Sequence, residues 1–311
     1  MNIVAIEGLT RKFGDIAAVD NMNLTIREGE IYGLLGPNGA GKSTLINILS
    51  GLLKMNSGKV ELMGMDIRKG HNNLKKKIGV VPQDIAIYED LTARENVNFF
   101  SGLYGCRGTE LKQNVIEALA FVGLIENADK FPKAFSGGMK RRLNIACAIA
   151  HKPELIIMDE PTVGIDPQSR NHILESVKEL NRRGSTIIYT SHYMEEIEAV
   201  CDRAGIIDHG KLIAEGTGDE LKAIVSDKQF IIIGLENADG LDVSQLQEID
   251  GIVNVLKDGN IIKIENTKVI NNWDKIIRCI DMQGVRISNI ESRTPTLETV
   301  FLTLTGRTLR D

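Results

Sequence analysis

Short apolar runs recur along the first two thirds of the chain, at residues 4–6, 31–35, 78–81, 155–158, 186–189 and 204–207. Each run has the length of a β-strand, and helical patterns fall between several of them. The runs at 155–158 and 187–189 are apolar on both faces, as expected of central strands that are buried from both sides. The pattern therefore predicts an α/β domain that covers residues 1–225.

The stretch between residues 84 and 150 has a mostly helical pattern, for example at 111–121. It lies between two of the apolar runs that predict strands of the sheet. We therefore expect this stretch, roughly residues 84–150, to form a helical subdomain inserted into the sheet domain.

The pattern changes again after residue 227. Residues 229–234 resemble a strand, and residues 252–264 give a hairpin signal with a turn at Asp258-Gly259-Asn260. Helices are expected at 269–282 and 296–304, the second entered through Thr294-Pro295, with another strand at 285–290. These elements predict a small α+β domain over residues 228–311, in which no motif can be tied to chemistry.

Composition narrows the function classes. A length of 311 residues suits about two domains, and the net charge of −5 argues weakly against a nucleic-acid binder, which usually needs a basic face. The four cysteines are widely spaced and suggest neither a disulfide framework nor a zinc site, which fits a reducing cytosol. No run approaches the ~20 apolar residues that cross a bilayer, and no signal peptide is recognisable. If the protein serves a membrane, we expect another chain to provide the span.

Residues 36–44 match the phosphate-binding pattern G-x-x-x-x-G-K-[ST] between an apolar run and a helical pattern. Backbone N–H groups at a helix N-terminus favour anionic phosphates, and glycines permit the close approach. Lys42 is expected to reach the β- and γ-phosphates of a nucleoside triphosphate, and Ser43 to bind Mg²⁺. The predicted loop consists of Gly36, Pro37, Asn38, Gly39, Ala40, Gly41, Lys42, Ser43 and Thr44.

The strand predicted at 155–158 ends in two carboxylates, Asp159 and Glu160. By itself this could be a plain strand terminus. Downstream of a phosphate-binding loop it predicts a catalytic pair, in which Asp159 supports Mg²⁺ through water and Glu160 orients and polarises the attacking water.

Four further pieces follow in order: Gln83 after Val-Val-Pro, the segment FSGGMKRR at 135–142, GIDP at 164–167 and TSH at 190–192. Together with the loop and the carboxylates, this set closely resembles the nucleotide-binding subunit of ATP-binding cassette (ABC) transporters over the first ~220 residues. The segment TPTLETVFL at 294–302 also resembles the C-terminal extension of the drug-export branch. The resemblance implies an α/β fold of the P-loop NTPase class with an ABC-type ATPase core, and ATP and Mg²⁺ as its cofactors.

The resemblance also implies roles for single residues. Gln83 would sense Mg²⁺ and the attacking water, also binding the metal together with Ser43 and Asp159, and His192 would contact the γ-phosphate. Phe13 would stack on adenine. Without the motif context, Phe13 would more often be a core residue, His192 structural and Gln83 an ordinary loop glutamine.

The segment at 135–142 implies a partner. Phe135 and Met139 stand where leucine and glutamine are usual, but Ser136, Gly137 and Gly138, which the resemblance assigns to the γ-phosphate of the partner's ATP, are kept. A serine and two glycines at a helix start would form a second anion-binding N-terminus. One chain needs only one such site for its own ATP, so a head-to-tail homodimer is expected, with Asp166 coupling its two sites.

The leading hypothesis is an ATPase subunit that drives a separate integral-membrane permease, and the resemblance favours an exporter of drugs or lipophilic substrates. The protein would then be cytoplasmic and peripheral on the inner face of the cell membrane, and the insertion between Gln83 and Ser136 would dock on the permease. A soluble ABC protein that acts on ribosomes or DNA is less consistent with one phosphate loop, no heptad run and an acidic balance. Glu160 and His192 disfavour a regulatory binder that does not hydrolyse ATP.

Overall fold

The computed structural model describes residues 1–69, 71–225, 228–267, 270–293 and 296–306. The described chain divides into two compact units, Met1–Thr217 and Gly218–Gly306. The short helix α8 (Gly218–Ala223) belongs to the second unit, where it contacts α11 (Leu297–Thr305), although the sequence pattern placed its residues in the first domain. Thr294-Pro295, predicted to lead into the last helix, lies outside the described residues, as do residues 268–269 and 307–311.

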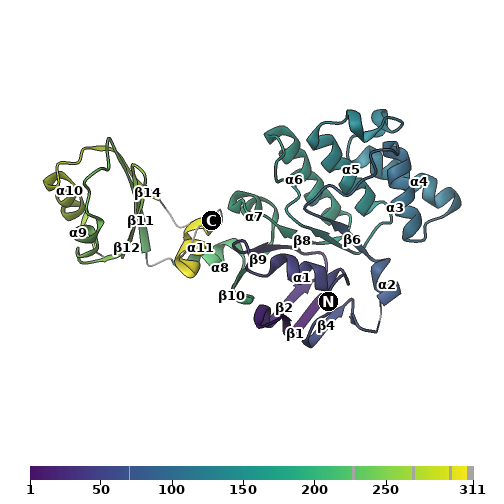
Figure 1. The fold of residues 1–311 in the computed structure, drawn as a ribbon, viewed down its shortest axis with the longest axis horizontal. Helices are drawn as coiled ribbons and strands as arrows, with labels where there is room; N and C mark the ends of the chain where they lie inside the picture. The colour runs from purple at the N-terminus through teal and green to yellow at the C-terminus, as the bar shows by residue number, and fades with distance from the viewer. Residues whose placement is uncertain (70, 226–227, 268–269, 294–295, 307–311) are drawn as a thin grey trace. The chain divides into compact units, whose positions relative to one another are not determined.

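The first unit is organised around a six-stranded sheet with the strand order β10-β9-β3-β8-β7-β6 (Figure 1). The five strands from β9 to β6 run parallel, and β10 is antiparallel to β9. Every residue of β3, β7 and β8 is buried, which explains why these runs are apolar on both faces. The strands are β3 (Ile31–Leu35), β6 (Ile78–Val81), β7 (Leu155–Met158), β8 (Thr186–Thr190), β9 (Arg203–Asp208) and β10 (Lys211–Gly216).

A second, antiparallel sheet packs against the first through α1 (Lys42–Leu49). Buried side chains of both sheets and of α1, among them Leu9, Leu45 and Leu155, form one apolar core. The sequence pattern found only residues 4–6 of this sheet, because its long strands carry register shifts that interrupt the alternation. Its strands are β1 (Asn2–Phe13), β2 (Ile16–Arg27), β4 (Ser57–Leu62) and β5 (Met65–Asp66).

Helices dominate the chain between β6 and β7, with α3 (Ala93–Leu103), α4 (Gly108–Phe121) and α5 (Gly137–Ile149) in mutual contact. The predicted helix at 111–121 lies within α4. Thr92 and Glu95 form a capping box that starts α3 by satisfying two backbone N–H groups. The unit also contains α2 (His71–Lys75), α6 (Pro167–Arg182), α7 (Met194–Val200) and the short 3₁₀ turns Ile125–Asn127 and Pro132–Ala134. No helix of the described residues is both long and apolar enough to span a bilayer.

The second unit contains an antiparallel sheet with the strand order β12-β13-β11-β14. Its apolar core lies under α9 (Val243–Gln247) and α10 (Trp273–Met282), which share one face of the sheet (Figure 1). The predicted hairpin is formed by β12 and β13, and Gly259 takes a positive φ of 57° in the turn between them. The strands are β11 (Lys228–Leu235), β12 (Ile252–Asp258), β13 (Ile261–Thr267) and β14 (Ile287–Arg293).

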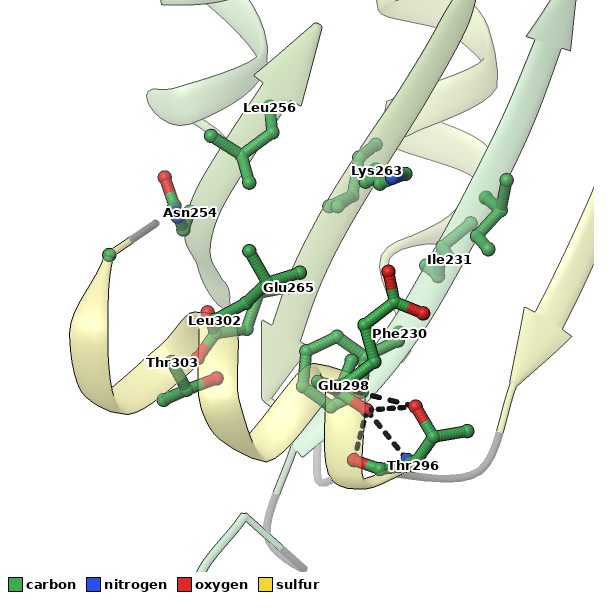
Figure 2. Close-up of a pocket in the computed structure, with 14 residues that line it drawn as sticks. Phe230, Ile231, Asn254, Leu256, Lys263, Glu265, Thr296, Glu298, Leu302 and Thr303 are labelled. Carbon is green, nitrogen blue, oxygen red and sulfur yellow. Dashed lines mark hydrogen bonds between the residues drawn. The ribbon is translucent and has the colours of Figure 1, made fainter. Parts of the chain in front are cut away.

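A cavity of about 120 Å³ lies between α11 and three of these strands (Figure 2). Phe230, Leu256 and Leu302 give it an apolar lining, with Lys263 and Glu298 among its polar residues. Four of its lining residues, Thr296, Glu298, Thr299 and Leu302, belong to the segment at 294–302. It contains none of the residues to which the sequence assigns chemistry, so the candidate chemistry lies in the first unit.

Candidate active site

The order of the strands brings the separated motifs together. β6, β7, β8 and β3 are parallel neighbours, so their carboxyl ends lie at one edge of the sheet. Gln83 follows β6, Asp159 and Glu160 follow β7, His192 follows β8 and the phosphate-binding loop follows β3. Ligands of such sheets bind at this edge. A cavity of about 310 Å³ is found there, lined by residues 37–44 with Phe13, Ala18, Gln83 and Glu160.

The backbone of the loop leaves no room for side chains at two of its glycines. Gly41 has a φ of 107°, and a Cβ built on it would lie 2.2 Å from the carbonyl oxygen of Ala18. A Cβ on Gly36 would lie 2.5 Å from the carbonyl oxygen of Ile207. Because α1 begins directly after Gly41, the loop presents a helix N-terminus to the cavity, and such a terminus attracts phosphate.

Lys42 is the cation of this loop. The residue is only 5 % exposed, and its Nζ donates hydrogen bonds to the carbonyl oxygens of Gly36 at 2.6 Å and Pro37 at 3.1 Å. Burial lowers the pKa of Lys42, and the nearby carboxylates of Glu160 and Asp159 oppose that shift. The loop therefore holds a largely desolvated ammonium group beside two carboxylates, which suits it to an anionic ligand.

Thr190 fixes the two carboxylates at the end of β7. Its hydroxyl donates to Oδ1 of Asp159 at 2.7 Å and accepts from the backbone N–H of Glu160 at 2.8 Å. Glu160 itself has a φ of 49°, an unusual conformation for a residue other than glycine. The backbone strain and the paired hydrogen bonds together set the direction in which the Glu160 side chain leaves the strand.

The carboxylate of Glu160 joins two other predicted residues. Its Oε1 lies 2.5 Å from Nε2 of His192, and its Oε2 accepts a hydrogen bond from Nε2 of Gln83 at 3.1 Å. Burial raises the pKa of Glu160, while His192 and Lys42 partly counter this effect. A carboxyl group with a raised pKa between an imidazole and an amide has the chemistry of a general base.

The oxygen donors at this edge fit Mg²⁺. Mg²⁺ retains several waters and takes one or two carboxylates together with phosphate oxygens. Asp159 supplies a carboxylate, Ser43 a hydroxyl on the cavity wall and Gln83 an amide whose nitrogen is already bound to Glu160. Among the described residues no cluster of three or more histidine, cysteine, aspartate or glutamate side chains could hold a metal alone. A Mg²⁺ ion that arrives with a nucleotide matches this sparse donor set.

Phe13 lines the same cavity. It is the last residue of β1, is 49 % exposed and lies 4.6 Å from the guanidinium of Arg11, measured from the ring centroid. A half-exposed ring at this position is not a core residue and is available to stack on a nucleotide base.

The predicted signature and coupling residues lie outside the cavity. Ser136 caps α5 by accepting from the N–H of Met139 at 3.2 Å, with Gly137 beside it at the helix start. Asp166 caps α6 in the same way. A Cβ on Gly138 would lie 2.2 Å from the hydroxyl of Ser169, so α5 and α6 approach closely there. One copy of the chain thus does not bring these residues to its own phosphate loop.

Sequence reasoning assigned no role to three residues that shape the site, Thr190, Ala18 and Arg141. Arg141 is 3 % exposed and donates to the carbonyl oxygens of Pro82 at 2.8 Å and Gln83 at 2.5 Å. It thereby holds the backbone around Gln83. An arginine within the basic run 140–142 gives no sign that it is buried, so only the folded structure identifies it.

Comparisons with known proteins agree with this geometry. The family model described as ABC transporter matches residues 19–163. The linearmycin resistance ATP-binding protein LnrL of Bacillus subtilis is 45 % identical over 98 % of this chain and 99 % of its own length. The daunorubicin resistance ATP-binding protein DrrA3 of Streptomyces coeruleorubidus is 34 % identical, with 97 % and 96 % covered. The Nod factor export ATP-binding protein I of Sinorhizobium fredii is 36 % identical, with 99 % and 88 % covered.

Solved structures match about two thirds or more of the chain. The ATP-binding subunit of an ABC transporter superposes with a TM-score of 0.66 at 28 % identity, over 71 % of this chain and 92 % of that one. A dimeric ATP-binding cassette in a post-hydrolysis state, bound to ADP and Pi, superposes with a TM-score of 0.63 at 30 % identity. This match covers 69 % of this chain and 98 % of that one. With the phosphate-binding loop, the carboxylates and the sheet order in place, these matches show that the chain belongs to the ABC transporter family, as an ATP-binding subunit with an ATPase domain.

Proposed function

We propose that the chain hydrolyses Mg²⁺-bound ATP in a head-to-tail homodimer and thereby drives a separate integral-membrane permease that exports drugs or other lipophilic compounds. Its relatives of similar length are named for resistance to linearmycin and daunorubicin and for Nod factor export. The subunit would act at the inner face of the cell membrane, bound to that permease.

The observation that carries the proposal is the arrangement around Glu160. Glu160 is held between Gln83 and His192 at the edge where Lys42 and the loop would bind the phosphates. Water aligned by Glu160 attacks the γ-phosphorus, the bond from that phosphorus to the β–γ bridging oxygen breaks, and ADP leaves with inorganic phosphate. Glu160 takes up the proton of the attacking water. Bound Mg²⁺ would neutralise charge on the phosphate oxygens, held by Ser43, Asp159 and Gln83.

Residues that one chain leaves unused support the proposed dimer. Ser136 and Gly137 are exposed at the start of α5, and neither lines the cavity of its own chain. The start of a helix thirteen residues long attracts anions. In a head-to-tail pair these residues and Gly138 would contact the γ-phosphate bound by the partner's loop, and the exposed Asp166 would lie between the two sites.

An apolar patch supports docking on a membrane partner. Tyr88 and Phe99 are 50 % and 42 % exposed, and their ring centroids are 5.2 Å apart. Ile85 and Leu103 are also exposed, and Ile85 follows Gln83 closely in the chain. Exposed apolar clusters of this kind mark interaction surfaces. We assign this patch to the permease, because a movement there would reach the active site through Gln83.

Substitution of Glu160 by Gln tests the proposal. The amide keeps the shape of the side chain but cannot take up a proton, so turnover should fall on the order of 10²-fold or more while ATP still binds. The stalled enzyme should elute as a dimer in size-exclusion chromatography with saturating Mg²⁺ and ATP, and as a monomer without nucleotide.

The matched control is Glu154→Gln, which alters an exposed glutamate paired with Lys77 at the opposite end of β7. It should leave turnover unchanged. If Glu160→Gln hydrolyses ATP at the wild-type rate, the assignment of the base is wrong. If the stalled enzyme remains monomeric at saturating ATP, the head-to-tail model fails for the isolated subunit.

A further inference from the structure

A buried carboxylate lies behind the active site and belongs to none of the sequence motifs. Glu196, on α7, has a fully buried side chain. Its Oε2 accepts hydrogen bonds from the hydroxyls of Ser191 at 2.6 Å, Thr162 at 2.9 Å and Tyr189 at 2.9 Å. Its Oε1 lies 2.5 Å from Nε of Arg170. Four partners from three separate segments therefore converge on one side chain.

Such an arrangement is poorly explained by stability alone. A buried charge is costly to desolvate, and well-packed apolar residues often replace a buried ion pair without loss of stability. What the charged cluster does provide is geometry, because three hydroxyl donors and a guanidinium must keep fixed positions to satisfy the carboxylate.

Two of the partners lie next to catalytic side chains. Thr162 comes two residues after Glu160, and Ser191 directly precedes His192. Since Glu160 and His192 also contact each other at 2.5 Å, the contacts close a ring that runs through Glu160, Thr162, Glu196, Ser191 and His192. A change at Glu196 would alter two sides of this ring together, and with them the distance between the base and the imidazole.

A third partner, Arg170, connects the ring to α6. Arg170 lies one turn after Asp166, the capping residue of that helix. The Arg170 guanidinium also lies 4.4 Å from the centroid of the Tyr193 ring, and the N–H of Tyr193 donates to the hydroxyl of Ser191 at 2.9 Å. Ser191 and Tyr193, the residues on the two sides of His192, are thus connected to α6 through Glu196 and Arg170.

We propose that Glu196 is a positioning residue for ATP hydrolysis. It holds Glu160 and His192 at their working distance and passes the position of α6, whose first turn carries Asp166, to both of them. Glu196 does not line the nucleotide cavity, and it reaches Glu160 and His192 through Thr162 and Ser191. The inference rests on the proposed function, because it assigns Glu160 and His192 to hydrolysis.

Substitution of Glu196 by Gln removes the charge with little change in volume. We expect kcat for ATP to fall about 10-fold or more, because small misplacements of catalytic groups are expensive in rate. The Kd for ATP should stay within about twofold of the wild-type value, because the phosphate loop does not contact Glu196. Ser191→Ala, which deletes one ring contact and leaves the buried charge paired with Arg170, serves as a milder variant with the same expected direction if Glu196→Gln does not fold.

Glu30→Gln is the matched control. Glu30 is 6 % exposed and also pairs with an arginine, Arg203, at 3.0 Å, but it lies outside the ring and the nucleotide cavity. This variant should show a similar loss of thermal stability and a wild-type kcat. If Glu30→Gln lowers kcat as much as Glu196→Gln does, the effect is one of general stability and the positioning role is overturned.

A double-mutant cycle with His192→Ala distinguishes a positioning role from a purely structural one, because it measures whether the effect of Glu196→Gln on kcat depends on His192. If Glu196 acts through His192, Glu196→Gln should reduce kcat much less in the His192→Ala background than in the wild type. Fully additive effects, or a wild-type kcat in Glu196→Gln, overturn the inference. If the wild-type chain itself does not hydrolyse ATP, the proposed function fails, and that result is recognised before any Glu196 variant is made.

Discussion

The two units of this chain form sheets from similar apolar patterns, but they bury different groups. Along the edge of its parallel sheet, the first unit buries Lys42, Asp159, Glu160 and Glu196, all of them charged. The core of the second unit is aliphatic, and Glu265 is the charged residue buried among its described residues. Buried charged residues that a fold does not need for packing indicate a functional site. The contrast between the two units therefore places the candidate active site in the first unit.

Backbone strain shows the same contrast. Among the described residues, every residue other than glycine with a positive φ lies in the first unit: Asn21, Met63, Lys152, Glu160 and His209. The other four lie outside the site, Asn21 within β2 and the remaining three in turns or loops, so positive φ alone is not diagnostic. At Glu160 the strain coincides with burial and with the cluster of carboxylates, and that combination marks a functional position.

Lys42→Ala should have the largest effect of any change that tests this contrast. It removes the buried cation that the loop holds for the phosphates, so ATPase activity should fall about 10²-fold or more in a steady-state phosphate-release assay. Lys59→Ala is the control, because Lys59 is an exposed lysine in the same unit that pairs with Glu61. Near wild-type turnover in Lys42→Ala would contradict the assignment of the phosphate loop.

Ile264→Ala examines the opposite side of the comparison. Ile264 is 1 % exposed in the core of the second unit, so its truncation should cost about 2–5 kcal/mol of that unit's unfolding free energy. Urea denaturation should show the loss in the transition of the second unit, and ATPase activity below that transition should be unchanged. A parallel loss of nucleotide binding would show that the two units are not energetically separate.

The strands that the sequence predicts correctly are those whose apolar pattern matches their burial in the folded chain. The runs that became β3, β7 and β8 are apolar on both faces because the strands are covered on both sides, so their pattern survives folding unchanged. The antiparallel strands β2 and β4 escaped notice, because bulges in the β1 ladder shift the alternation.

The residues of the candidate site differ in the same way: some are given by a local motif and others depend on partners distant in sequence. The loop and Glu160 were predicted because a fixed pattern of residue types carries their chemistry, and the role of Gln83 was predicted from the family resemblance. Thr190 and Glu196 received no role, because each matters through partners that lie far away in sequence: Glu196 gains its meaning from Thr162, and Thr190 from Asp159. Such contacts exist only after the sheet has assembled, and a single sequence does not encode them as a local pattern.

Glu160→Gln should also have a smaller effect, on thermal stability, that depends on pH and tests whether the charge buried in the first unit is costly. The pKa of Glu160 is raised in the fold, mainly by burial, so the folded state disfavours the ionised form. The stability that Glu160 contributes is therefore fully present below its unfolded pKa and is lost as pH rises through the folded pKa. The amide does not ionise. Without nucleotide, Glu160→Gln should thus melt higher than wild type at pH 8, by roughly 2 °C, and the gap should close toward acidic pH.

A melting difference between these proteins that is constant from pH 5 to pH 8 would contradict this explanation. Wild-type ATPase activity should fall on the acidic side as Glu160 becomes protonated, with a midpoint above the usual range of a glutamate carboxyl. No substitution in the aliphatic core of the second unit should shift that midpoint.

Truncation should have the smallest effect on the nucleotide site. The phosphate loop, Glu160 and His192 all lie within Met1–Thr217, where one apolar core joins both sheets to α1. A chain that ends at Thr217 should therefore bind a fluorescent ATP analogue with a Kd within about twofold of the full-length value. A chain that ends at Val225 is the informative comparison, because it keeps α8 without its contact to α11 and exposes the buried Leu221. If the shorter chain is the more soluble and binds the analogue equally well, the functional boundary lies before α8 and not at residue 225. A loss of binding in both chains would show that the second unit completes the nucleotide site.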